Sequence, residues 1–265
     1  MPSRCSDIAS NMRHLFRIKN LKLKIKNCCA NREESQARLS YPEVQPAIDE
    51  VNLELRMKGE ELSINEQLKE IKRSFRLMMN GVAAQSMRDK GLDYHVNWGA
   101  SVPMLKAKAK EIGKNRDLAI ALWKEDVREC KILATMIMPA EEMLPEIVDI
   151  WMEQTTSVEM AEMASFNLYQ HLPFAADKAY QWMASPKPIY QLCGFHVLSR
   201  LFMNGQEPNE RGINEFLDQA IAAIGGESLT VRKAAVTCVI RFADLGLVYE
   251  RLAKSAMKSA NLEVF

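Results

Sequence analysis

Few residue groups in this chain have the types and spacing that catalysis or metal binding requires. Cys193 and His196 lie three residues apart in a helical pattern, so both side chains could reach one metal ion. No further ligand accompanies them at a metal-binding spacing, and core packing is the simpler interpretation of the pair. The sequence therefore predicts no metal site and no cofactor.

The familiar phosphate-binding and hydrolase motifs are absent. The chain contains no Walker loop, no GxGxxG, no HExxH and no GxSxG. Lys106 and Lys110, however, lie one turn apart in a predicted helix and can present two ammonium groups on one face. Such a face suits the phosphates of a nucleic acid, and it is equally compatible with an ordinary solvated helix.

The composition is that of a soluble globular protein. Of 265 residues, 48% are hydrophobic and 26% are charged. No apolar run is long enough to span a membrane, and the first residues lack the apolar core of a secretory signal. The six cysteines show no paired spacing, so we expect reduced thiols in a cytoplasmic protein.

Charge is distributed unevenly along the chain, although the net charge is only +1. Residues 1–45 carry +5, residues 64–116 carry +6 and residues 231–265 carry +3. The middle is acidic, with −10 over residues 117–230. The basic blocks are either a nucleic-acid footprint or solvated helix faces, and the acidic middle argues against DNA binding there.

The elements that must position these residues are helices. Residues 117–138 contain two apolar patterns at helical spacing, separated by Lys124-Glu125-Asp126 and ended by Pro139. This arrangement predicts a helical hairpin. A lone hairpin cannot bury both of its apolar faces, so we expect neighbouring pairs.

Repeats follow the first hairpin. Val127, Val158 and Ile189 recur every 31 residues, each near the start of a second helix. Tryptophans end the preceding helices and are expected in the core: Trp123, Trp151 and Trp182. The period predicts an all-α fold, an α-α superhelix of HEAT-like repeats.

Two regions are expected in the chain. Residues 46–265 form a single HEAT-like repeat domain in this interpretation. Residues 1–45 are a basic N-terminal arm in which Leu21, Leu23 and Ile25 alternate with lysines. A short strand, a frayed helix and a disordered segment all stay open for this arm.

These motifs carry a family resemblance over residues 63–262. The segment LAIALWKEDVRECKILATMI resembles the signature hairpin of the AlkD-like DNA alkylation repair family, in which LA..LW....E...LA recurs. The segments NWGASVPMLKAKAKEIGK and VRKAA are similar to that family's basic helix and late RKA helix. The resemblance implies helix pairs that cradle duplex DNA and excise cationic N3- and N7-alkylated purines without a metal.

The resemblance also implies site residues. Its catalytic aspartate falls near Glu162, which keeps a carboxylate with one extra methylene of reach. Its aromatic and cationic partners fall near Val158, Leu192 and Thr237, so those partners are missing at the aligned positions. Arg232 and Lys233 match the family pattern and are expected to contact phosphate, with an exposed helix face as the alternative.

Two hypotheses follow. The first is a DNA alkylation repair protein that binds duplex DNA through Lys106, Lys110, Arg232 and Lys233, and that acts as a 3-methyladenine or 7-methylguanine glycosylase if Glu162 is active. It predicts that the four basic residues share one surface. The second is a catalytically inactive HEAT-repeat scaffold for a protein partner. It predicts a groove lined by acidic and apolar groups.

Overall fold

The computed structural model describes residues 64–92 and 94–265, which all belong to one compact unit, Gly59–Phe265. These residues are helical and form no strand; a single β-bridge joins Val96 to Val127. The prediction of an all-α fold is therefore confirmed. The predicted basic arm, residues 1–45, lies outside the described residues.

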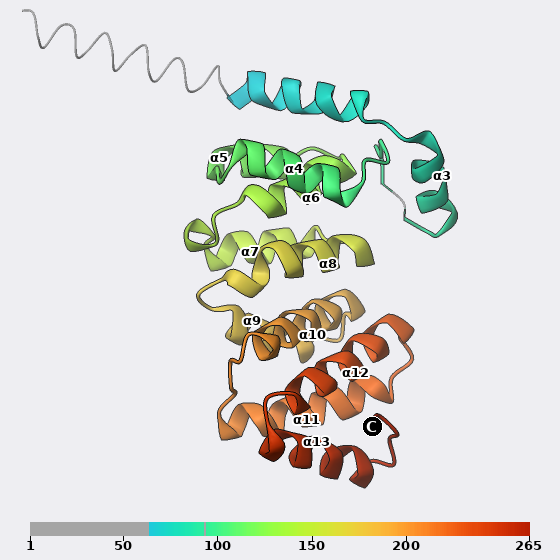
Figure 1. The fold of residues 1–265 in the computed structure, drawn as a ribbon, viewed down its shortest axis with the longest axis vertical. Helices are drawn as coiled ribbons and strands as arrows, with labels where there is room; N and C mark the ends of the chain where they lie inside the picture. Colours follow the sequence, from blue (N-terminus) through green and yellow to red (C-terminus); the bar gives the residue numbers. More distant parts are fainter. Residues whose placement is uncertain (1–63, 93) are drawn as a thin grey trace, which may run out of the picture. The chain divides into compact units, whose positions relative to one another are not determined.

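The helices follow one another along the unit (Figure 1). The first described helix covers residues 64–77. In chain order it is followed by α3 (Gly81–Asp89), α4 (Val102–Ile112), α5 (Arg116–Trp123), α6 (Arg128–Ile137), η1 (Ala140–Glu142), α7 (Pro145–Glu153), α8 (Val158–Asn167), η2 (Tyr169–His171), α9 (Ala175–Met183), α10 (Pro188–Met203), α11 (Glu210–Ile224), α12 (Leu229–Ala243) and α13 (Leu247–Ser259).

Local sequence accounts for where these helices begin. An N-cap side chain satisfies an unpaired backbone N–H in the first turn of four helices, at Asn80, Asn115, Ser157 and Asn209. Proline occupies the first turn of α4, α7 and α10, where its missing N–H costs nothing. The predicted hairpin is α5 and α6, and α6 ends at Ile137, two residues before Pro139.

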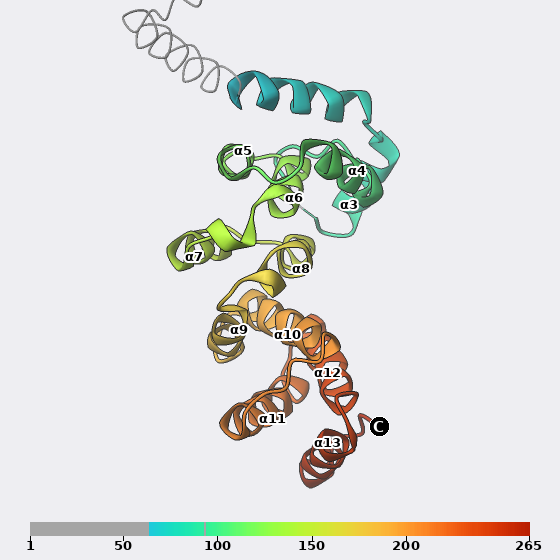
Figure 2. The same ribbon diagram turned by 60° about the vertical axis from the view of Figure 1, so that its left-hand side comes forward.

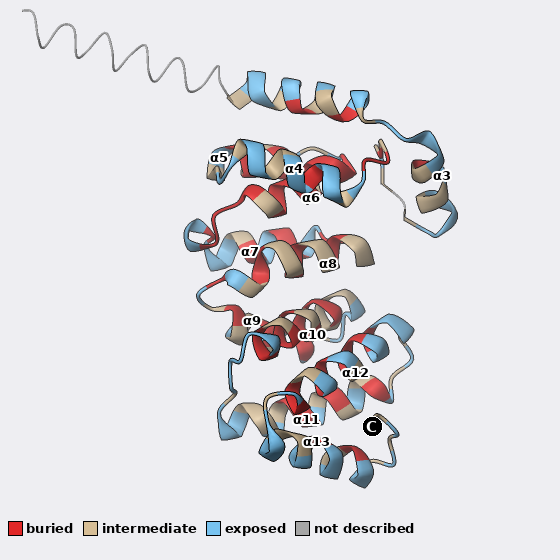
Figure 3. Ribbon diagram, viewed as in Figure 1, coloured by how far each residue is buried: buried red, intermediate tan, exposed pale blue. Residues whose placement is uncertain are grey.

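The helices form two layers (Figure 2). We call α4, α6, α8, α10 and α12 the second-helix layer, because each packs against the next. From α6 onward, each of these helices is the second member of its pair. We call α5, α7, α9 and α11 the first-helix layer, which covers one side of the other layer. Both layers bury apolar faces against each other, and buried residues lie between the stacked helices (Figure 3).

The repeated tryptophans are core residues, as predicted. The exposed fraction of Trp123, Trp151 and Trp182 is 2–3%. The rings of Trp123 and Trp151 stack with centroids 4.1 Å apart, and Trp123 Nε1 donates a hydrogen bond to Gln154 Oε1 at 2.7 Å. The 28-residue spacing of Trp123 and Trp151 therefore brings two successive pairs into contact, whereas Trp182 packs against Tyr169.

Two further predictions concern the environment of the chain. No helix among the described residues has the length and apolar character needed to cross a membrane. Cys130, Cys193 and Cys238 are buried and form no disulfide. The cytoplasmic location expected from the cysteine pattern stays a prediction.

Candidate functional site

Positive and negative charges are separated between the two layers. The five helices of the second-helix layer carry nine Lys and Arg residues against four Asp and Glu. The four helices of the first-helix layer carry three Lys and Arg against eight Asp and Glu. Most of the helical acidity of residues 117–230 therefore lies on the layer opposite the predicted DNA-binding lysines.

This separation shows where the acidic residues of the middle of the chain lie, while its effect on DNA binding stays a prediction. Within the second-helix layer, the middle helices α6, α8 and α10 are electrically balanced, with three basic and three acidic residues. The ends of the layer, α4 and α12, are basic. An average taken along the chain mixes the two layers and hides this pattern.

The four predicted DNA-binding residues are exposed on the two ends of the second-helix layer. Lys106 and Lys110 lie on α4, and Arg232 and Lys233 lie on α12. None of the four forms an ion pair with a carboxylate of the described residues. Arg232 donates a hydrogen bond to the carbonyl oxygen of Gly226 at 2.7 Å, which holds its side chain near the start of α12.

The predicted carboxylate, Glu162, lies between these two ends on α8. Its side chain is 40% exposed, and its Oε1 lies 3.9 Å from Nε2 of His196 on α10. The imidazole of His196 meets the ring of Phe166 edge-on, with centroids 5.0 Å apart. The guanidinium of Arg200 lies over the same ring, 4.5 Å from its centroid. We call Glu162, Phe166, His196 and Arg200 the central cluster.

Burial sets the protonation of the central cluster. Burial, and secondly the negative charge of Glu159, raises the pKa of Glu162 above its ordinary value. Burial, and secondly the positive charge of Arg200, lowers the pKa of His196 to about 4. His196 is therefore neutral near pH 7, and its contact with Glu162 is not an ion pair. The Nε2 atom of His196 has no hydrogen-bond partner.

The structure supplies an aromatic ring and a cation that sequence alignment did not find. Leu192, the aligned arginine position, is an apolar core residue that is only 2% exposed. Arg200 lies two turns further along α10 and forms no ion pair with a described carboxylate. The sequence signal that could have found it is the spacing of His196 and Arg200, which puts both on one helix face.

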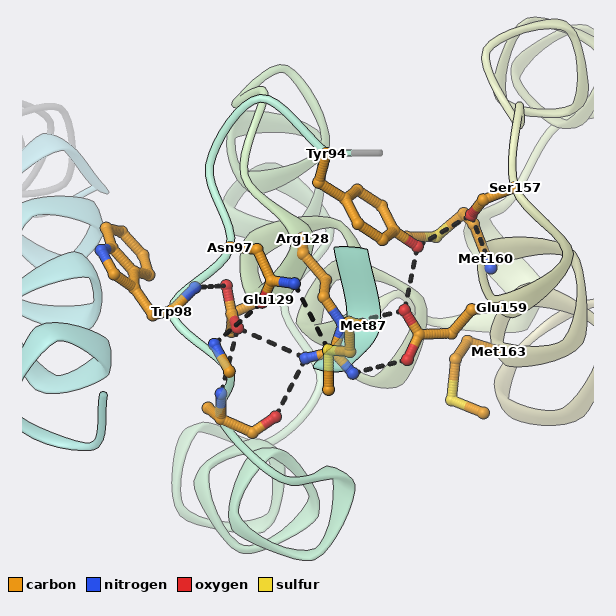
Figure 4. A network of polar contacts seen from close by, with 12 residues as sticks. Met87, Tyr94, Asn97, Trp98, Arg128, Glu129, Ser157, Glu159, Met160 and Met163 are labelled. Atoms are coloured by element: carbon orange, nitrogen blue, oxygen red, sulfur yellow. Dashed lines mark hydrogen bonds and ion pairs between the residues drawn. The ribbon is translucent and has the colours of Figure 1, made fainter. Parts of the chain in front are cut away.

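Glu159 lies one turn before Glu162 but has a different environment (Figure 4). Arg128 Nε and Nη2 bind its two carboxylate oxygens at 2.8 and 2.5 Å. The Tyr94 hydroxyl donates to Glu159 Oε2 at 3.0 Å. Glu159 is thus held by three hydrogen bonds, two of which belong to an ion pair with Arg128. Glu162 is the carboxylate of α8 that is free to act.

The arrangement can support proton transfer and charge stabilisation. Glu162 offers a half-exposed carboxyl group, Arg200 an unpaired guanidinium and Phe166 a ring edge. Among residues 64–92 and 94–265, no three His, Cys, Asp or Glu side chains gather as metal ligands would. The described chemistry is therefore that of a carboxyl group beside an anion-binding cation.

Comparison with protein families identifies the family of this chain. A family model described as "DNA alkylation repair enzyme" matches residues 71–235, which is more than half of the chain. The chain belongs to the DNA alkylation repair enzyme family. In this family member, the matched range runs from the described helix of residues 64–77 to the middle of α12.

A solved structure supports the fold of this family member. The similar protein is described as one of "a new family of proteins related to the HEAT-like repeat DNA glycosylases with affinity for branched DNA structures". The TM-score is 0.65 at 17% sequence identity, over 72% of this chain and 82% of that chain. The HEAT-like fold prediction is therefore confirmed. A comparison with curated proteins finds no match for this chain.

Proposed function

We propose that this protein binds double-stranded DNA along the second-helix layer, and that Glu162 promotes release of N3- or N7-alkylated purines without a metal. The observation that carries the proposal is the separation of charge between the layers. Basic helices stand at both ends of the second-helix layer, and a free carboxyl group lies between them. DNA phosphates would contact the ends, and the damaged nucleotide would lie at α8 and α10.

Release of such a base requires only a modest catalytic contribution from Glu162. An N3- or N7-alkylated purine already carries a positive charge, which weakens its glycosidic bond. A carboxylate near the sugar stabilises the positive charge that develops as the bond breaks. Arg200 can hold the adjacent phosphate, because its guanidinium has no carboxylate partner among the described residues.

Binding across a range of salt concentrations tests the DNA-binding part. We expect affinity for a methylated duplex to fall with salt at a slope of about −4 or steeper, because each phosphate contact releases condensed counterions. The similar solved structure belongs to a protein described as having affinity for branched DNA, so a four-way junction is the second probe. Absence of binding to both probes at low salt would reject this function.

Replacement of the carboxyl group tests the excision part. Glu162→Gln should abolish release of 7-methylguanine without lowering the melting temperature, because Glu162 makes no strong contact that holds the fold. Glu153→Gln, an exposed carboxyl group of the first-helix layer, is the matched control and should leave release unchanged. Retained release in Glu162→Gln would remove this assignment.

A second candidate function, a scaffold for a protein partner, is favoured by one observation. A cavity of about 400 Å³ lies between α9 and α11, with acidic and apolar lining: Asp177, Tyr180, Leu198, Leu201, Glu207 and Glu215 among others. Its lining comes from α9, α11 and the segment before α11, and also from Leu198 and Leu201 of α10. If the protein fails to bind DNA, this cavity becomes the surface to test with a basic peptide.

A further inference from the structure

The helix of residues 64–77 packs on the rest of the described unit through one face (Figure 1). Ile71 and Phe75 on that face are buried, with exposed fractions of 4% and 0%. Lys72, at the edge of the same face, forms an ion pair with Glu125 at 2.7 Å, just after α5. The orientation of the helix is therefore fixed, and its opposite face points to solvent.

Three cations without an acidic partner lie along this outward face. Lys69, Arg73 and Arg76 follow one another at spacings of four and three residues, so they form one stripe about 10 Å long. All three are exposed, and none forms an ion pair with a carboxylate that the structure describes. Glu66 and Glu70 lie along one edge of the stripe and leave the outward face with an excess positive charge. We call Lys69, Arg73 and Arg76 the N-terminal stripe.

Trp98 fixes one end of the N-terminal stripe. The guanidinium of Arg76 lies over the Trp98 ring, 6.0 Å from its centroid, and the ring of Phe75 lies 5.9 Å from the same ring. The Trp98 backbone N–H donates to Glu129, a fully buried carboxylate that also pairs with Arg128. Contact with an aromatic face leaves the N–H donors of a guanidinium free, so Arg76 keeps its capacity to bind a phosphate.

Exposed apolar side chains follow the stripe directly. Leu77, Met79 and Val82 are 84%, 64% and 83% exposed, and they lie in the turn that leads from this helix into α3. Asn80 holds the turn in place, because its backbone N–H donates to the Trp98 carbonyl oxygen at 2.8 Å and its side chain caps α3. Exposed apolar side chains that gather beside charged ones are a mark of binding surfaces.

A cationic stripe and an apolar turn require different parts of one ligand. Phosphates satisfy the cations of the stripe, but they offer nothing to apolar side chains. The apolar surfaces of duplex DNA are the faces of its stacked bases. Proteins that reach these faces insert side chains such as Leu, Ile or Met between two base pairs from the minor groove. The insertion kinks the duplex, and cations beside the inserted side chains bind the phosphates.

We propose that the turn of residues 77–82 is a wedge that enters the minor groove of duplex DNA and opens one base step, while the N-terminal stripe binds the adjacent phosphates. Leu77 and Val82 are the inserted side chains. This surface is separate from the second-helix layer, and it adds bending of the DNA to the proposed function. The inference rests on the duplex binding proposed above, but it does not require catalysis by Glu162.

The salt dependence of binding to an unmethylated duplex tests the stripe. Lys69→Gln/Arg73→Gln/Arg76→Gln should reduce the salt slope by about 2 to 3, because each lost phosphate contact removes about 0.9 from the slope. Lys124→Gln/Arg211→Gln, which removes two exposed charges elsewhere, is the control and should leave the slope unchanged. The melting temperature of each variant shows that it is folded.

Energy transfer between dyes at the two ends of the duplex tests the wedge. We expect the wild-type protein to bend the duplex by about 20° or more, as inserted side chains do. Leu77→Ser/Val82→Ser should lose this bend and keep the salt slope, because it removes no cation. Leu144→Ser/Ile150→Ser, which replaces two exposed apolar side chains at α7, is the matched control and should keep the bend.

The outcomes separate this inference from the proposed function. A duplex that is bound but not bent, or that Leu77→Ser/Val82→Ser bends as the wild type does, would overturn the wedge and leave the contacts of α4 and α12 intact. An unchanged salt slope in the stripe variant would overturn the role of the stripe. If that variant instead loses binding to phosphatidylserine vesicles, the surface binds lipid. Absence of binding to any DNA would overturn both proposals.

Discussion

Neighbouring residues of one type differ in this protein because of what surrounds them. Glu159 is bound by Arg128 and Tyr94, whereas Glu162 lies beside a neutral imidazole. The two carboxyl groups occupy adjacent turns of α8 and have different partners. Two carboxylates with separated roles are a recurrent way to divide acid and base functions.

His196 should make the stability of the protein depend on pH. Its folded-state pKa of about 4 lies below the value of about 6.5 expected in the unfolded chain. Between these pH values, His196 is protonated in the unfolded chain but neutral in the folded protein. The free energy of unfolding therefore falls as the pH is lowered from about 6.5 toward 4. At pH 5 the loss should be about 2 kcal/mol.

Urea denaturation at a series of pH values measures this loss. In His196→Gln the decrease in stability between pH 7 and pH 5 should become smaller by about the stated amount, whatever the stability at pH 7. His171→Gln, at an exposed position of η2, is the control. A wild-type pH dependence in His196→Gln would show that the imidazole does not resist protonation.

Arg128 should contribute strongly to stability because its removal leaves two acidic side chains without their cation. Arg128→Met should cost about 3–5 kcal/mol, the usual penalty for breaking a buried ion pair. Adding Glu159→Gln should recover part of that loss, since the double variant leaves fewer unpaired charges. Denaturant titrations of both single variants and the double variant give the coupling. If the stability changes of the two single variants simply add up in the double variant, the contact between Arg128 and Glu159 does not contribute to stability.

At the scale of elements, α9 and α10 approach each other closely at Gly194. A Cβ atom added at Gly194 would lie 2.7 Å from the carbonyl oxygen of Ala179 and 2.8 Å from the backbone nitrogen of Met183. Both of those atoms belong to α9, whose backbone cannot move aside cheaply. Glycine at this position therefore sets how closely the two layers approach.

Gly194→Ala should be destabilising for this reason. We expect a loss of about 1–3 kcal/mol, measured by denaturant unfolding, because the added methyl group overpacks the contact. Gly225→Ala is the matched control, since its added atom would meet neighbours only at 3.6 Å and beyond. Equal stability of the two variants would mean that α9 and α10 can separate without cost.

At the scale of the whole molecule, the second-helix layer has two basic ends and a balanced middle. If DNA lies along the layer, both ends contribute phosphate contacts. If DNA binds only one end, the other end contributes none. Removing charges from each end separately distinguishes the two arrangements.

The paired substitutions Lys106→Gln/Lys110→Gln and Arg232→Gln/Lys233→Gln make this test. Each pair should reduce the salt slope of DNA binding by about 2, because each lost contact removes about 0.9 from the slope. Combining the pairs should reduce it by about 4. Lys124→Gln/Arg211→Gln, which removes two exposed charges outside the second-helix layer, is the control. If a pair of substitutions leaves the salt slope unchanged, the end of the layer that carries this pair does not contact DNA.

The sequence by itself determined the helical repeat and its core. The periodic tryptophans, the restart of the apolar pattern at Val127 and the break before it are local signals, and local periodicity states which face of a helix is buried. Residue types at helical spacing were sufficient for these results. Glu162 was proposed through the family resemblance, and its catalytic role stays a prediction.

Only the tertiary structure decided which side chains act together. The separation of charge into layers depends on which helix of each pair belongs to which layer. The net charge summed along the sequence does not contain this information. Arg128 and Glu159 are 31 residues apart in sequence, and Arg200 reaches the central cluster from another helix. Contacts between helices depend on how the pairs pack, because side chains distant in sequence meet only after the layers have formed.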